Sequence, residues 1–140
     1  MSEQDKTKHV REVFDAWNSH DSERFAKLLD EKLVIESDTL PQTLKGRDAA
    51  KQFFLVYVNA FPDLHFQIDQ MLAVDEYVVT RWTATGTHRG DLMGIAPTGK
   101  RGVTHGCSIA EFRNGHPVHD RIYWDSGNLL RQLGVLPAFK

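Results

Sequence analysis

The spacing of the apolar residues changes once along this chain, near Pro62, and this change limits the folds open to it. Between Val10 and Trp17 apolar residues fall at i, i+3, i+4 and i+7, which predicts a first helix ending near residues 18–20. Asp21 can cap a second, shorter helix. A third helix opens at residues 46–48, and Pro62 ends it because proline lacks the N–H that a helix needs. Three helices therefore come first.

After Pro62 the apolar residues follow the two-residue period of strands. The predicted strands are residues 64–74, 77–88, 101–113 and 117–124. Asn114-Gly115 is typical of a tight hairpin turn, and a last helix capped by Asp125 or Ser126 runs to Leu133. Helices followed by an antiparallel meander predict an α+β fold in which a curved sheet covers the helices. We expect a single domain over residues 1–140.

The charge and the amino-acid composition limit the kinds of molecule that this chain is expected to bind. The net charge is −2 with both signs interspersed, so we expect no nucleic acid and no membrane partner, and a small neutral molecule fits better. No apolar run approaches the roughly 20 residues of a membrane helix, and no signal segment is evident, which predicts a cytoplasmic protein. Cys107 is the only cysteine, and none of the seven histidines has zinc-site spacing. We therefore expect no metal and no cofactor.

The last predicted strand carries one carboxylate among apolar residues. Alternation places Val118, Asp120, Ile122 and Trp124 on one face. Apolar surroundings raise the pKa of a carboxyl group and suit it to proton transfer near neutral pH. Asp120 is therefore a candidate catalytic residue. The alternative is a solvated position near the sheet edge, or an ion pair with a nearby arginine.

A second pair of carboxylates, Glu36 and Asp38, follows the second predicted helix on a short strand over residues 33–38. Two carboxylates that point into one cavity push their pKa values apart, which is the arrangement that acid/base chemistry uses. Both are candidate catalytic residues. The alternative is a solvated strand end.

A long loop, residues 89–100, joins two of the predicted strands and carries Leu92, Met93 and Ile95 among glycines. Loops of this length in a small domain are commonly lids or contact segments. The loop is either an apolar flap over a ligand, or a plug or subunit contact. His88 and His105 flank it and are candidates for the cavity mouth, and the favoured alternative for each is a hydrogen-bonded strand-end histidine.

Several motifs together resemble the SnoaL-like polyketide (ester) cyclases. They are AFPDLH at 60–65, GTH at 86–88, Gly90, Gly94, PTG at 97–99, Asn114-Gly115 and LRQLG at 130–134. The resemblance covers nearly the whole chain. It implies a cone-shaped barrel like that of nuclear transport factors, with helices packed in a strongly curved, mostly antiparallel sheet around an apolar pocket, and a homodimer.

The resemblance also implies where the chemistry of such cyclases would lie. An aspartate on the last strand acts as acid/base in an aldol closure, with a histidine on the preceding strand. The matching positions here are Ile122 and Ser108, which cannot transfer that proton. In limonene-epoxide-hydrolase-like relatives, pocket residues before a GRDA segment align through residues 46–49 with Glu36 and Asp38.

Three functions follow as hypotheses. The first is a cyclase-type enzyme in which Asp120 or Glu36 serves as general base for enolate chemistry on an apolar carbonyl or polyketide-like substrate. The second is a non-catalytic protein that binds a small hydrophobic molecule. The third is isomerase, hydratase or epoxide-hydrolase chemistry from Glu36 and Asp38. The candidate pocket residues are Ile122, Ser108, Trp124, His88, His105, Trp17, Phe54 and Met93.

Overall fold

A computed structural model describes residues 1–139 of the chain. The helices α1 (Glu3–Ser19), α2 (Ser22–Lys27) and α3 (Gly46–Ala60) precede the long strands, and the short strands β1 (Val34–Glu36) and β2 (Leu44–Lys45) lie between α2 and α3. The long strands are β3 (His65–Val74), β4 (Tyr77–Thr87), β5 (Arg101–Arg113) and β6 (His116–Trp124), followed by α4 (Ser126–Gln132). This order confirms the predicted change from helices to strands.

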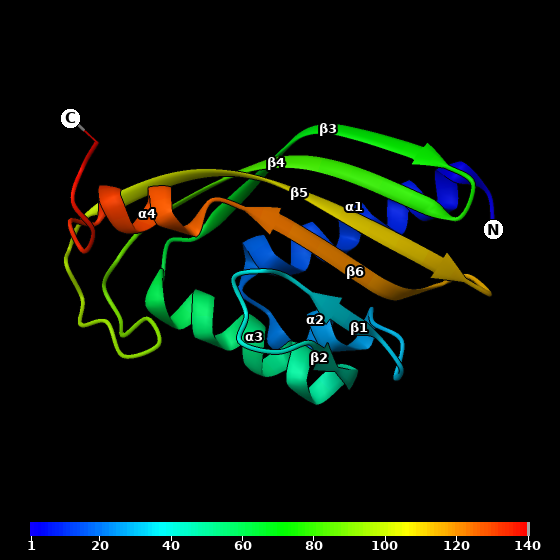
Figure 1. Cartoon of the computed structure of the whole chain (residues 1–140). Helices are drawn as coiled ribbons and strands as arrows, with labels where there is room; N and C mark the ends of the chain where they lie inside the picture. The colour runs from blue at the N-terminus through cyan, green and yellow to red at the C-terminus, as the bar shows by residue number, and fades with distance from the viewer. Residues whose placement is uncertain (140) are drawn as a thin grey trace.

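The strands form one six-stranded sheet in the order β2-β1-β6-β5-β4-β3. All neighbours are antiparallel except β1 and β6, which pair in parallel. Figure 1 shows the long strands curving over α1, with α2 and α3 on the same side of the sheet. The strands β2 and β3 end the sheet and do not pair with each other, so among the described residues the sheet is curved but unclosed. The predicted α+β fold with a strongly curved, mostly antiparallel sheet is confirmed.

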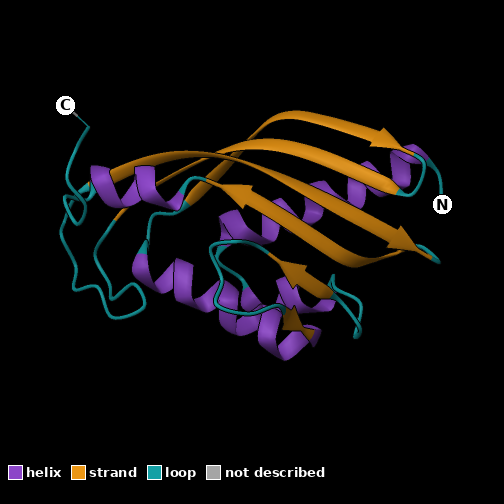
Figure 2. Cartoon of the chain, viewed as in Figure 1, coloured by secondary structure: helices purple, strands orange, loops and turns teal. Residues whose placement is uncertain are grey.

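Local capping explains where the helices begin. The Ser2 hydroxyl accepts a hydrogen bond from the Asp5 backbone N–H at 3.0 Å, and the Asp5 carboxylate accepts one from Ser2 in return. Asp21 caps α2, and Asp125 caps α4 by accepting from the Asn128 N–H at 2.9 Å. The predicted caps at Asp21 and Asp125 are thus confirmed. Figure 2 shows α4 directly after β6, beside the long loop that joins β4 to β5.

The structure corrects four details of the prediction. The strand β1 is shorter than residues 33–38, β2 was not predicted, and β4 ends before His88. A bulge interrupts the pairing of β5 with β6 between Glu111 and Phe112. Because a bulge inserts one extra residue, it changes the alternation at the start of β6. Pro117 rather than Val118 therefore joins Asp120 on the inner face, where it lines the cavity described below.

The core lies between the inner face of the sheet and the helices. Its buried residues include Phe14 of α1, Phe54 of α3 and Trp82 of β4, with Leu92 from the loop after β4. Apolar burial of this kind is the main stabilising contribution to the fold. Within residues 1–139 no helix is long and apolar enough to cross a membrane.

Candidate active site

A cavity of about 140 Å³ lies between α1, α3 and the inner face of the sheet. Its lining is mostly aromatic and aliphatic, with a few polar side chains on the strands. The volume is close to the roughly 150 Å³ of a cavity that accepts a benzene-sized ligand. The space suits a compact ligand of one or two rings. The polar lining residues are His9, Tyr57, Thr80, Thr85, Thr104, Ser108 and Asp120.

Asp120 lies on β6, where it pairs with Ala110 of β5 on one side and Ile35 of β1 on the other. Its Oδ1 is buried and has no hydrogen-bond partner. Burial raises the pKa of Asp120 from 3.8 to about 7, because the low-polarity surroundings disfavour the charged carboxylate. Arg121 pairs with Glu36 and Glu111 on the outer face and not with Asp120. The carboxyl group is able to hold or release a proton near neutral pH.

Four hydroxyl groups on β4 and β5 also line the cavity, those of Thr80, Thr85, Thr104 and Ser108. The Ser108 hydroxyl accepts a hydrogen bond from the Trp82 indole N–H at 3.0 Å. The hydroxyl oxygens of Thr80 and Thr104 are buried and unpartnered among the described residues. A buried polar atom without a partner costs stability, and a ligand that hydrogen-bonds to it removes that cost.

Four of the predicted pocket residues line the cavity, namely Trp17, Ser108, Ile122 and Trp124. Ser108 and Ile122 are cross-strand partners in the row next to Asp120. The alternation read from β6 therefore places Asp120, Ile122 and Trp124 on the inner face as predicted.

Two predicted pocket residues are buried behind the cavity. Phe54 is fully buried and packs on Trp17, with their ring centroids 4.5 Å apart. His88 is also fully buried, and its Nδ1 accepts a hydrogen bond from the Thr98 backbone N–H at 3.2 Å. Neither residue lines the cavity. Their placement in the pocket is wrong because core packing and the loop backbone enclose them.

Two other predicted pocket residues point away from the cavity. His105 is exposed on the outer face of the sheet, where its Nδ1 lies 2.9 Å from the Thr83 hydroxyl. Met93 is 58% exposed at the tip of the loop, whereas Leu92 is buried beneath it. Leu92 and Ile95 form a bridge, and Met93 and Gly94 both have positive φ, as a two-residue hairpin turn requires. The loop thus inserts Leu92 into the core, and its tip faces away from it.

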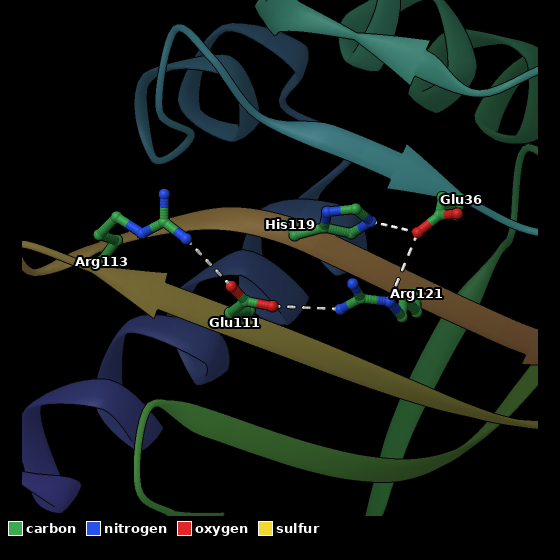
Figure 3. A network of polar contacts seen from close by, with 5 residues as sticks. All are labelled: Glu36, Glu111, Arg113, His119 and Arg121. Atoms are coloured by element: carbon green, nitrogen blue, oxygen red, sulfur yellow. Dashed lines mark hydrogen bonds and ion pairs between the residues drawn. The ribbon is translucent and has the colours of Figure 1, made fainter.

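Glu36 faces outward, which corrects its predicted place in the cavity. Figure 3 shows its carboxylate in contact with His119 and Arg121, the two residues that flank Asp120 on β6. Arg121 also pairs with Glu111 at 3.3 Å, and Glu111 with Arg113 at 3.5 Å. The cause is the burial of Ile35, since alternation along β1 then turns Glu36 to the opposite face.

Asp38 is exposed and lies outside the main cavity. It borders a surface depression with Ser37, Thr39 and Asp125, and this depression adjoins the cavity at Ile122 and Trp124. Glu36 and Asp38 therefore do not share a cavity, which removes the geometric basis of the predicted carboxylate pair.

The sequence analysis missed His9 and Tyr57. Tyr57 of α3 lines the cavity, and burial raises its pKa to about 12, so its hydroxyl stays protonated. His9 of α1 lines the cavity as well, and burial lowers its pKa. A signal for His9 was present, because it precedes Val13 by four residues and belongs to the same helical face. Across residues 1–139 no group of three or more His, Cys, Asp or Glu side chains could hold a metal ion.

The model of one protein family, described as SnoaL-like polyketide cyclase, matches residues 7–133. The chain belongs to this family. Among curated proteins, none matches it in sequence. The resemblance stated from the motifs is thereby confirmed, and the family supports a cyclase-type function in general terms.

Solved structures with the same fold include bacterial relatives. The candidate hydroxylase AclR of Streptomyces galilaeus is 28% identical, with a TM-score of 0.87, over 99% of this chain and 87% of its own. The candidate polyketide cyclase IdmH of Streptomyces antibioticus is 25% identical, with a TM-score of 0.78. The match covers 92% of this chain and 98% of IdmH. TsrD of Streptomyces laurentii is 20% identical, with a TM-score of 0.86, over 97% and 99%, and shows the fold alone.

Proposed function

We propose that this family member is an acid/base enzyme that moves a proton on a small apolar carbonyl compound, with Asp120 as a proton-transfer group. The observation that carries the proposal is the unpartnered, buried Oδ1 of Asp120 in a largely apolar cavity. Acid/base catalysis is most effective when the pKa of the group lies near the working pH, and Asp120 has a pKa of about 7.

The loss of folding stability caused by burying this carboxyl group favours an enzyme over a protein that only binds a ligand. An ionisable group buried without a partner destabilises the folded state. A cavity that only holds an apolar ligand gains nothing from such a group, whereas an acid/base enzyme depends on it. The neighbouring hydroxyl groups of Thr80 and Ser108 are hydrogen-bond donors that suit a carbonyl oxygen.

The size and lining of the cavity define the substrate class. A volume of about 140 Å³ with aromatic walls fits a compact ketone or ester of one or two rings. The chemistry that Asp120 supports on it is enolisation, which begins both an aldol-type ring closure and a double-bond isomerisation. All of the groups for this step come from the chain itself.

The proposal is tested with 2-indanone, an apolar ketone with acidic protons next to its carbonyl group. Proton NMR in D₂O measures the exchange of these protons for deuterium, and saturation-transfer NMR measures binding separately. The wild type is expected to accelerate exchange, and Asp120→Asn to reduce the protein-dependent rate by about 100-fold or more. Glu36→Gln is the control, because Glu36 lies on the outer face of the adjacent strand.

Three outcomes would count against the proposal. Exchange by Asp120→Asn at the wild-type rate would remove Asp120 from the reaction. Binding of 2-indanone without any accelerated exchange would favour the non-catalytic ligand-binding protein. Absence of both binding and exchange would contradict the proposed substrate class.

A further inference from the structure

His9 reaches the cavity from α1 and is held there by one hydrogen bond. Its Nε2 lies 2.8 Å from the carbonyl oxygen of Leu28, at the end of α2. A carbonyl oxygen only accepts hydrogen bonds, so Nε2 carries the proton and donates it. In the neutral imidazole, Nδ1 then has a free lone pair. Among the described residues Nδ1 has no hydrogen-bond partner. It is also not among the fully buried polar atoms, so part of its surface is accessible.

The contacts of His9 place it at the same end of the cavity as Asp120. Its ring packs edge-on against Phe112, with ring centroids 5.8 Å apart. Phe112 follows Ala110 by two residues on β5, and Ala110 is the cross-strand partner of Asp120. Both His9 and Asp120 line this cavity.

Burial, rather than a neighbouring charge, keeps the proton on Asp120 and off His9. Burial lowers the pKa of His9; the hydrogen bond to the Leu28 backbone and the charge of Glu12 raise it by less, and His116 lowers it slightly further. Burial raises the pKa of Asp120. Charged groups on the same elements have partners of their own: the Lys6 ammonium of α1 donates to the Asp75 carbonyl, and Arg121 of β6 pairs with Glu36 on the outer face. Slightly acidic to neutral pH therefore favours a neutral imidazole beside a protonated carboxyl group.

We propose that His9 is a second catalytic residue: its Nδ1 takes a proton from the carbon next to the substrate carbonyl while Asp120 donates its proton to the carbonyl oxygen. This inference rests on the proposed function. The C–H electron pair becomes the C=C bond of the enol, and the C=O π pair forms the new O–H bond. The step leaves imidazolium and carboxylate, and return of the two protons restores both residues. No oxidant or further reactant is needed.

The test compares His9→Gln with His20→Gln. Both histidines belong to α1 or its cap, and each places Nε2 2.8 Å from a backbone carbonyl oxygen, of Leu28 and Leu64 respectively. His20 does not line the cavity. The glutamine amide keeps a donor for the carbonyl but has no basic nitrogen. His9→Gln is expected to lower kcat for 2-indanone exchange by about 100-fold with KM within threefold of wild type. His20→Gln is expected to keep the wild-type kcat.

A pH profile of the wild type provides a test that needs no variant. If His9 is the base and Asp120 the acid, the rate at saturating 2-indanone falls at low pH, where the imidazole is protonated. It also falls tenfold per pH unit above about 7, where Asp120 loses its proton. A rate that rises through pH 7 to a plateau would show that Asp120 acts as the base, and would overturn the assignment of His9.

The outcomes separate this inference from the proposed function. Loss of exchange in Asp120→Asn together with wild-type exchange in His9→Gln removes His9 and leaves the proposed function intact. Equal losses in His9→Gln and His20→Gln indicate a structural role of helix anchoring and also remove His9 as a catalytic residue. Wild-type exchange in Asp120→Asn removes both proposals.

Discussion

Replacing Asp120 by asparagine should make the protein more stable at high pH while it removes the proton-transfer group. Asparagine has nearly the same shape but never ionises. In the wild type, the folded-state pKa of Asp120 is raised above the unfolded value of 3.8 to about 7. The stability associated with the protonated group is therefore fully present below pH 3.8 and is lost as the pH rises through 7.

The size of this effect follows from the pKa difference. One pKa unit corresponds to about 1.4 kcal/mol, so a rise from 3.8 to about 7 corresponds to about 4 kcal/mol of stability lost above pH 7. At about pH 5.5 roughly half of that loss has occurred. The unfolding free energy of Asp120→Asn minus that of the wild type should therefore grow by about 2 kcal/mol between about pH 5.5 and 8.5.

Urea unfolding of both proteins at several pH values measures this difference. Any hydrogen-bonding defect of the asparagine amide is independent of pH and cancels when two pH values are compared. Asp38→Asn is the matched control, because the same substitution at an exposed carboxylate should give a constant difference. A constant difference for Asp120→Asn as well would refute the claim that burial raises the pKa of Asp120, and with it the physical basis of the proposed function.

Three further changes are predicted. Gly106→Ala places a Cβ 2.2 Å from Cζ2 of Trp82, so urea unfolding should show a loss of about 1–3 kcal/mol and tryptophan fluorescence should shift. Leu92→Ala removes the buried anchor of the loop after β4, and should cost about 2–5 kcal/mol and speed proteolysis within that loop. Ile122→Asp adds a second carboxyl group to the cavity, so urea unfolding should show a steeper loss of stability than in the wild type as pH rises.

The order of helices and strands was predictable because each element has a local signal. Proline and capping residues mark the helix ends, and the Asn114-Gly115 turn fixes the β5–β6 hairpin. The strand β2 has only two residues, which is too short for any period to appear. The bulge between Glu111 and Phe112 depends on how two strands pair, and neither strand alone encodes it. Homodimer formation and a single domain over residues 1–140 stay predictions.

The prediction of the site residues succeeded where the alternation of a single strand determined their orientation. It failed where the orientation depended on how two elements pack together. Alternation along β6 was enough to bring Asp120 and Ile122 to one face. The orientation of Glu36 depends on parallel pairing of β1 with β6, in which Glu36 lies opposite Arg121. His9 required the packing of α1 on the end of β5, a contact between residues about a hundred positions apart in sequence.

The position of Ile122 explains why the proton-transfer groups proposed for this chain lie at one end of the cavity. Ile122 faces Ser108, and the Ser108 oxygen already accepts the Trp82 N–H, so that row of the sheet offers no acid or base. Asp120 lies two residues earlier, about 6–7 Å along β6, and toward the Phe112 ring that contacts His9. In the proposed reaction the substrate would present its carbonyl group at this end, between α1 and β6, with its apolar rings extending toward Trp124. A ketone whose bulk surrounds the carbonyl on both sides should bind in this cavity more weakly than one that carries the carbonyl at its edge.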